Sequence, residues 1–186
     1  SSKIVTERYR LKNANDSMRR FMDSDCDFFL TPQDDQWIQD SGLIENISNL
    51  YKQESNVGLI GLRDGFDYNF SNMISSHFSV KTGGTIRWVK SGEYAKVQAV
   101  NDGAMIVNKE TINKVGYFDA ENFNAFYIEM DYSARCNKAG LSNYVLGAEL
   151  VHLKLGGTMA SELYDSGLDY GAKDLSMLRS KHPDIF

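Results

Sequence analysis

Two short apolar runs on either side of an amphipathic segment are the feature that most constrains the fold of this chain. Residues 26–31 and 57–62 are predicted to be buried strands, and residues 41–53 a helix, because apolar side chains recur there at helical spacing. Upstream, residues 3–10 look like a strand and residues 16–22 like a short helix. This alternation of strands and helices predicts an α/β fold, with a sheet covered by helices.

The rest of the chain adds further elements without any sign of a second domain. Short β-rich runs in the middle are separated by Gly83-Gly84 and Ser91-Gly92, which predicts antiparallel strands. These runs cover residues 77–80, 85–90 and 93–100. Later strands are expected at residues 104–108, 144–146 and 150–152, and helices at residues 109–115, 127–139 and 170–180. No linker or repeat interrupts the pattern, so a single domain is predicted.

The overall composition limits the classes of protein to which the chain can belong. Its 186 residues are 42% hydrophobic and 24% charged, which is ordinary for a globular protein with a core of its own. A net charge of −5 without any basic cluster argues against nucleic-acid binding. No apolar stretch is long enough to span a membrane. Cys26 and Cys136 lack disulfide-scaffold or zinc-site spacing, so reduced thiols and a cytoplasmic location are expected.

The apolar run at residues 26–31 is followed closely by two adjacent carboxylates, Asp34 and Asp35. Neighbouring negative charges repel each other, and a divalent cation such as Mg2+ or Mn2+ offsets that repulsion by binding carboxylate oxygens. Ligands of open α/β sheets also bind where strands end. Both residues are therefore candidate metal ligands. The alternative is an exposed acidic turn that caps the next helix.

A second acidic group, Glu129 and Asp131, lies at the start of the predicted helix 127–139. The helix dipole favours negative charge in a first turn, so a carboxylate there is suited to act as a general base. The alternative is a charge that only stabilises the helix, with Arg135 as the i+4 partner of Asp131. His152, at the end of an apolar strand, is a candidate third metal ligand or else an ordinary histidine.

The order of these groups along the chain resembles that of family 2 glycosyltransferases of the GT-A fold. The resemblance covers roughly residues 13–160, and most of its motifs lie between residues 101 and 158. Those motifs are a glycine-plus-apolar strand (102–107), a Gly-x-Phe-Asp turn (116–119), an acidic helix start (128–131, with Arg135), an Ala-Gly helix end (139–140) and a histidine before a glycine (His152 and Gly156). Upstream, residues 28–37 are similar to the family's metal motif, often Asp-x-Asp-Asp.

The resemblance implies a single, Rossmann-like GT-A domain over residues 1–186. Its central sheet would be mixed and mostly parallel, flanked by helices, with a small antiparallel β element. Residues 1–100 would form the half that binds nucleotide sugar and metal, and residues 101–186 the acceptor half. GT-A domains open with a strand and a helix that hold the nucleoside, and these are not recognisable before Ser1. Either the domain belongs to a longer polypeptide, or residues 3–10 are its first strand in a small version of the fold.

The resemblance also implies an activity, that of a metal-dependent, inverting glycosyltransferase. Such an enzyme moves a sugar from a nucleotide-sugar donor, commonly a UDP-sugar, to a hydroxyl group of a glycan or glycoconjugate. Mn2+ or Mg2+ would be the cofactor, with Asp34, Asp35 and His152 as its ligands. Asp34, Asp35 and Arg19 would bind the donor. Glu129 would be the catalytic base, with Asp131 as the alternative.

Two departures from the family pattern leave other functions open. Pro32 stands where the first aspartate of the metal motif would be, and Ile128 replaces the first acid of the Glu-Asp-x-Asp helix start. Trp88 and Tyr94 are candidate sugar-stacking residues or core aromatics. One alternative function is a Mg2+-dependent phosphohydrolase that uses the two adjacent aspartates. The other is a non-catalytic carbohydrate-binding or scaffold module of the same fold.

Overall fold

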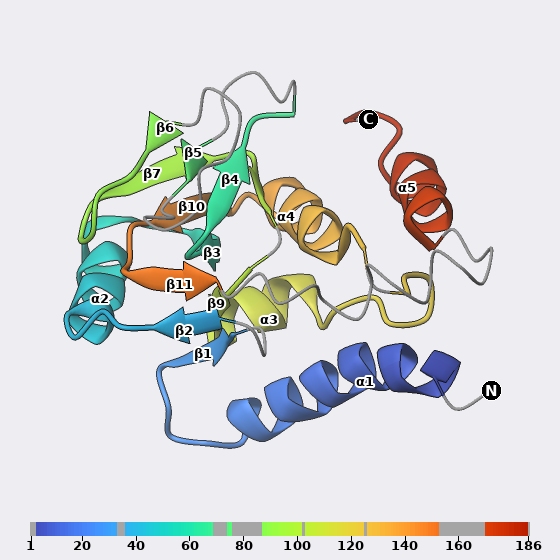
Figure 1. Ribbon diagram of the computed structural model, residues 1–186, viewed down its shortest axis with the longest axis horizontal. Helices are drawn as coiled ribbons and strands as arrows, with labels where there is room; N and C mark the ends of the chain where they lie inside the picture. Colours follow the sequence, from blue (N-terminus) through green and yellow to red (C-terminus); the bar gives the residue numbers. More distant parts are fainter. Residues whose placement is uncertain are drawn as a thin grey trace.

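The computed structural model describes residues 3–32, 36–68, 74–75, 87–101, 103–124, 126–152 and 170–185. Within these ranges, helices and strands follow one another along the chain in an α/β fold (Figure 1). The helices are α1 (Lys3–Met22), α2 (Leu43–Gln53), α3 (Lys109–Val115), α4 (Ile128–Lys138) and α5 (Tyr170–Lys181). The strands are β1 (Phe28–Thr31), β2 (Gln36–Ile38), β3 (Val57–Gly61), β4 (Asp64–Phe66), β5 (Ile74–Ser75), β6 (Arg87–Trp88), β7 (Tyr94–Val97), β8 (Ala99–Val100), β9 (Met105–Asn108), β10 (Ser142–Leu146) and β11 (Leu150–His152).

A five-stranded mixed sheet in the order β1-β9-β3-β10-β7 forms the centre of the fold. β10 runs parallel to β3, whereas the pairs β1–β9, β3–β9 and β10–β7 are antiparallel. The predicted α/β class and the mixed sheet are confirmed, but the prediction of a mostly parallel sheet is wrong. The main reason is β9, which lies between β1 and β3 and runs opposite to both. Sequence patterns identify each strand but do not say which strand lies beside it.

Two smaller sheets accompany the central one. β2 and β11 form an antiparallel pair, and a four-stranded sheet has the order β6-β5-β4-β8. In the second sheet β4 is antiparallel to β5 and β8, but β5 and β6 are parallel, so the prediction of an entirely antiparallel middle is partly wrong. The strand predicted at residues 77–80 lies outside the described residues.

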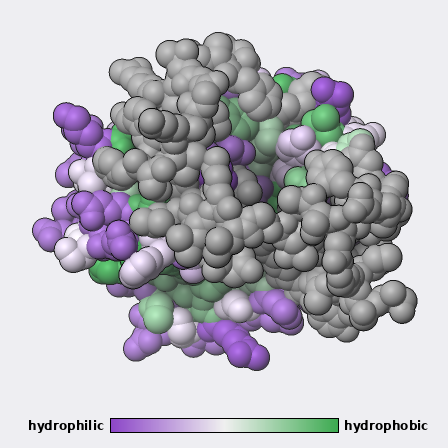
Figure 2. Space-filling view, in the orientation of Figure 1, coloured by the Kyte–Doolittle hydropathy of each residue, from purple (hydrophilic) through white to green (hydrophobic). Residues whose placement is uncertain are grey.

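Helices cover the central sheet on two sides, because successive residues of each strand point to opposite faces. On β3, Ile60 packs with the apolar face of α2, whereas Leu59 packs with residues of α1, α3 and α4. The two buried clusters therefore lie on opposite sides of the sheet. Hydrophilic side chains gather along the outer sides of α1 and α2, as expected for amphipathic helices that bury one face (Figure 2).

The strand predicted at residues 3–10 is wrong, because these residues belong to the long helix α1, which runs along one side of the molecule (Figure 1). Along this helix, Leu11, Met18 and Phe21 are buried at helical spacing, and Phe21 stacks on Phe29 of β1 with ring centroids 5.7 Å apart. This contact anchors the helix on the sheet. The short helix predicted at residues 16–22 continues from that anchor toward the N-terminus. Adding residues to an existing helix is favourable, and this overrides the local strand preference of residues 3–10.

The later elements agree closely with the predictions, because local signals mark their ends. Helix α3 begins after Asn108, whose side chain accepts a hydrogen bond from the backbone of Thr111 at 2.8 Å. Gly116 ends α3 and Gly140 follows α4, with φ of 84° and 75° respectively. Both helices therefore lie where capping and glycine signals indicate.

Candidate functional site

Three strands of the central sheet end at one edge. Thr31, Met105, Gly61 and Val145 lie side by side across β1, β9, β3 and β10. Because β1, β3 and β10 run in the same direction, their carboxyl ends meet here, beside the start of β9. We call this the carboxyl edge of the sheet. Loops that follow parallel strands converge at such an edge, which is where ligands of open α/β sheets bind.

Gly103, just before β9, is a point of close approach at the carboxyl edge. Its φ of +151° favours glycine, and an added Cβ would lie 2.7 Å from Cβ of Arg63 and 3.3 Å from Nε2 of Gln36. Arg63 follows β3, and Gln36 begins β2. Nε of Arg63 lies 3.3 Å from Oδ2 of Asp64, and both side chains are largely buried. The side chains of Arg63 and Gln36 thus both lie against Gly103, where there is no room for a further side chain.

The predicted metal ligands come from two segments of the chain, residues 34–35 and strand β11. Asp34 and Asp35 lie outside the described residues, but Gln36, which follows them, is the register partner of His152 in the β2–β11 ladder. The structure describes His152 as a strand residue, and its side chain is outside the described part. Among the side chains that are described, no group of three or more His, Cys, Asp or Glu is arranged to hold a metal ion. The ligand set therefore stays a prediction.

Helix α4 carries Glu129 toward the carboxyl edge. Since α4 leads through residues 139–141 into the start of β10, the helix and that strand run in opposite directions. The hydroxyl of Ser133 accepts a hydrogen bond from the backbone N–H of Val100 at 3.0 Å, and a Cβ on Gly61 would lie 2.4 Å from Cγ1 of Val100. The carbonyl of Ser133 also accepts a hydrogen bond from the side chain of Asn143, near the start of β10, so Ser133 lies beside the middle of β3. Glu129, half-buried and one turn earlier, lies about 6 Å further along the helix axis, toward the carboxyl end of the strand.

Asp131 faces the opposite way and is fully buried in an ion-pair network. Its Oδ2 lies 2.8 Å from Nε of Arg135, and its Oδ1 lies 2.8 Å from both Nζ of Lys181 and Nε2 of His182. Burial alone would raise the pKa of Asp131, but the charge of Arg135 and the hydrogen bonds from Lys181 and His182 outweigh it and lower the pKa. The predicted pair Asp131–Arg135 is confirmed. A carboxylate held in this way is poorly placed to accept a proton from a substrate.

Asp119, in the turn after α3, belongs to the same network. Its Oδ2 lies 2.7 Å from Nζ of Lys181, and its carboxylate accepts hydrogen bonds from the backbone and side-chain nitrogens of Asn122. Partial burial acts to raise the pKa of Asp119, but the hydrogen bonds from Lys181 and Asn122 lower it overall. Lys181 thus connects Asp119, which precedes α4, with Asp131 in the first turn of α4.

The other predicted site residues lie elsewhere. Arg19, a candidate donor contact, is exposed on α1, where it pairs with Asp16 at 2.6 Å and lies over the ring of Tyr117 at 4.9 Å. The hydroxyl of Tyr94 donates to Glu54 at 2.9 Å, and this contact favours a structural role over sugar stacking. Trp88 belongs to β6, and its side chain lies outside the described part.

Arg63, Lys181 and His182 make contacts in this region that sequence patterns do not reveal. Arg63 belongs to no motif, and its position depends on the turn between β3 and β4. Lys181 and His182 end the last helix, far along the chain from the carboxylates that they contact. Basic residues at a helix end are explained equally well by the helix dipole, so their position alone gives no signal.

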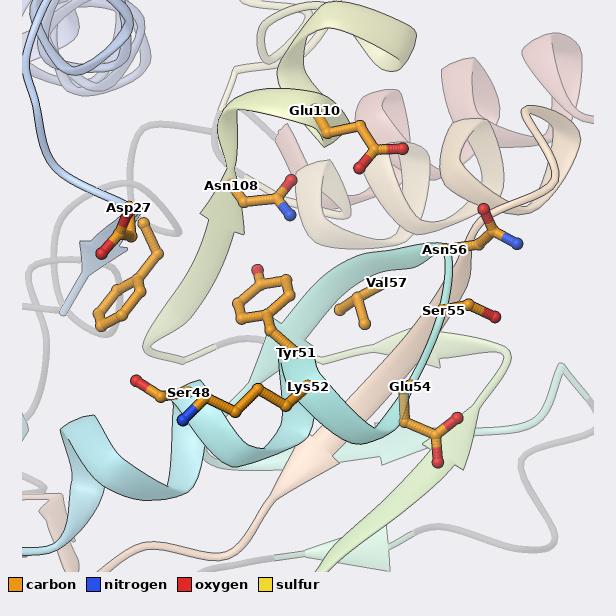
Figure 3. Close-up of a pocket in the computed structure, with 11 residues that line it drawn as sticks. Asp27, Ser48, Tyr51, Lys52, Glu54, Ser55, Asn56, Val57, Asn108 and Glu110 are labelled. Atoms are coloured by element: carbon orange, nitrogen blue, oxygen red, sulfur yellow. The ribbon is translucent and has the colours of Figure 1, made fainter.

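A pocket of about 640 Å³ lies at the opposite edge of the sheet. It is lined by residues at the amino ends of β1 and β3 and around the ends of α2 and β9, among them Phe28, Val57 and Asn108 (Figure 3). Tyr51 projects among these residues, and its buried hydroxyl has no hydrogen-bond partner within the described part of the chain. Burial raises the pKa of Tyr51, so the hydroxyl stays protonated. None of the predicted site residues whose side chains the structure describes lines this pocket.

Comparisons with known proteins do not assign the chain to a family. No protein-family model matches the chain, and no curated protein matches it closely enough to count as a relative. Of the helices that the structure describes, none combines the length and the apolar character that crossing a membrane requires.

Proposed function

We propose that this protein is a metal-dependent, inverting glycosyltransferase of GT-A type. The observation that carries the proposal is the convergence at the carboxyl edge. Gln36, which follows the predicted ligands Asp34 and Asp35 in the sequence, pairs with the predicted ligand His152, and the start of α4, which carries Glu129, points toward the same edge. A donor anchor and a general base are the two groups that sugar transfer to a hydroxyl requires, and here they come from segments far apart in the sequence.

The side chains proposed as ligands are of types that suit a divalent cation and a diphosphate. Asp34, Asp35 and His152 offer carboxylate oxygens and an imidazole, which suit Mn2+ or Mg2+. Arg63, which pairs with Asp64, lies against Gly103 at this edge, and its positive charge would favour a nearby phosphate group. When bound, the metal ion would neutralise negative charge on the diphosphate leaving group. Donors with UDP are proposed first, because UDP is the commonest nucleotide in the resembling family.

Glu129 is assigned the role of catalytic base. Its carboxylate takes the proton of the acceptor hydroxyl while that oxygen attacks the anomeric carbon. The bond from the anomeric carbon to the diphosphate breaks on the opposite face, and its electron pair leaves with the nucleoside diphosphate. A single displacement of this kind inverts the stereochemistry, by the logic that applies to inverting glycosidases. The fully buried Asp131 is less suited to this role, because three cationic or hydrogen-bonding groups already hold it.

The decisive experiment is calorimetric titration with UDP, GDP and CDP, each with Mn2+ and with EDTA. Metal-dependent binding of at least one nucleotide is expected. If no nucleotide binds in a metal-dependent manner, the transferase proposal is wrong. Metal-dependent nucleotide binding without release of nucleoside diphosphate from any of a panel of nucleotide sugars would instead favour a non-catalytic module.

Glu129→Gln tests the base directly. Transfer should be abolished while nucleotide affinity is retained, because the substitution keeps the shape of the side chain and removes its basicity. Glu110→Gln is the matched control, since Glu110 occupies the first turn of α3 and is exposed there. Full activity of Glu129→Gln would remove Glu129 from the mechanism.

A further inference from the structure

Helix α5 contacts the segment that leads into α4 at two separate places. Near its start, the fully buried carboxylate of Asp174 accepts hydrogen bonds from the backbone N–H groups of Asn124, at 3.1 Å, and Phe126, at 2.9 Å. At its end, Lys181 binds both Asp119 and Asp131, and His182, the next residue, binds Asp131. One helix therefore holds both the loop before α4 and the first turn of α4.

The entry into α4 needs this support, because its backbone is strained. Tyr127, which immediately precedes the helix, has a φ of 59°, a left-handed conformation that aromatic residues rarely adopt. Such a conformation persists only where neighbouring contacts hold it. Here Asp174 binds the N–H of Phe126 on one side, and the backbone N–H of Asp131 donates to the carbonyl of Tyr127 at 2.9 Å on the other.

The direction of Asp131 determines the direction of Glu129. Successive helical residues are rotated by about 100°, so two residues separated by one position point to nearly opposite sides of the helix. Because Lys181 and His182 hold Asp131 toward α5, Glu129 is turned away from α5. The rotation of the first turn is thus set by contacts from the other end of the chain.

We propose that Lys181 and His182 are positioning residues, which fix the first turn of α4 and thereby hold Glu129 in place for proton transfer. This inference rests on the proposed function, in which Glu129 is the base. Two buried nitrogens of the network, Nδ1 of His182 and Nη2 of Arg135, have no hydrogen-bond partner among the described residues. Apolar side chains in these positions would pack α5 against α4 without leaving polar atoms unpaired. Packing alone therefore does not explain why charged residues occupy them.

The test compares Lys181→Met and His182→Asn with Arg179→Ala. Arg179 is exposed on the same helix, so its removal changes the charge of α5 without touching Asp131. We expect kcat of the first two variants to fall about 10²-fold, with nucleotide Kd within about twofold of the parent protein, because the base is misplaced while the donor site is intact. Amide hydrogen exchange of Asp131 and of the next residues of α4, whose N–H groups are hydrogen-bonded along the helix, should become about tenfold faster in both variants and stay unchanged in Arg179→Ala.

Exchange does not depend on activity, so the two proposals fail separately. Unchanged exchange in folded Lys181→Met and His182→Asn overturns the positioning inference, whatever the activity. Faster exchange with unchanged kcat overturns it as well, because Glu129 would then work without the tether. If the parent protein binds no nucleotide, the proposed function fails and the exchange result alone shows whether α5 holds α4. Should either variant not fold, Lys181→Arg and His182→Gln, which retain hydrogen-bonding groups, are measured in the same way.

Discussion

Gln36 and His152 are register partners in the β2–β11 ladder, although they come from opposite parts of the chain. Gln36 follows the predicted ligands Asp34 and Asp35 in the sequence, so this pairing places the residue after them beside the strand that carries the third predicted ligand. The same side chain of Gln36 lies against Gly103, at the edge where β1 and β3 end. A metal site built from these residues would draw on segments that only the pairing of β2 with β11 brings together.

Substitution of the metal ligands should weaken metal-dependent nucleotide binding. Asp34→Asn is expected to lower the affinity for nucleotide in Mn2+ by at least about tenfold, because one anionic ligand is lost. Titration calorimetry measures this, with Asp27→Asn as the control, since Asp27 lies before β1 at the opposite edge. Unchanged affinity of Asp34→Asn, together with a loss in Asp35→Asn, would transfer the ligand role to Asp35.

Gly103→Ala should destabilise the fold for two reasons, an unfavourable backbone conformation and a steric clash at the carboxyl edge. The new Cβ would lie 2.7 Å from Cβ of Arg63, so the two segments would have to separate. We expect a loss of about 2–3 kcal/mol in the free energy of unfolding, from positive φ and overpacking together. Gly140→Ala separates the two effects, because its φ is 75° and nothing lies within 4 Å of an added Cβ. Equal losses in urea denaturation would show that contact with Arg63 is unimportant.

The stability of the fold should fall in acid partly through Asp131 and Asp119. Both have a folded-state pKa below the ordinary value of 3.8, so their contribution is present above that value and is lost as the pH falls through the lowered pKa. Asp131→Asn should cost about 3–5 kcal/mol at pH 7, because it leaves buried cations without a counter-charge. Its stability should then decline less steeply than that of the parent protein below about pH 5.

Asp16→Asn is the control for this comparison. Its ion pair with Arg19 is exposed, so a change below about 1 kcal/mol is expected at both pH values. Urea denaturation at pH 7 and at acidic pH measures all three proteins. A parallel decline of Asp131→Asn and the parent protein would contradict the assignment of acid sensitivity to Asp131.

The two cysteines should differ in reactivity. Cys26 is exposed, whereas Cys136 is buried and burial raises the pKa of its thiol to about 12. Because the thiolate is the reactive form, we expect a thiol-specific chromogenic reagent to label Cys26 in the native protein and Cys136 only after denaturation. Cys26→Ser should remove the fast reaction. Rapid labelling of Cys136 under native conditions would show that α4 opens readily.

Part of the site could be predicted because its signals are local. The start of α4, its acidic residues and the pair Asp131–Arg135 follow from helix periodicity and i+4 spacing. The contacts of Asp131 with Lys181 and His182 could not be predicted, because they depend on where α5 packs. The close approach of Gly103 to Arg63 and Gln36 likewise depends on loops that meet only in three dimensions.

The local sequence pattern predicts most helices and strands, since caps such as Asn108, glycines such as Gly116 and apolar periodicity act over a few residues. It did not determine the helical state of residues 3–10, which follows from the anchoring of α1 through Phe21 on Phe29. Nor did it determine the place of β9 between β1 and β3, or the contacts of α5 with the start of α4. These depend on hydrogen bonds and ion pairs between distant segments, whose geometry exists only once the sheet has formed.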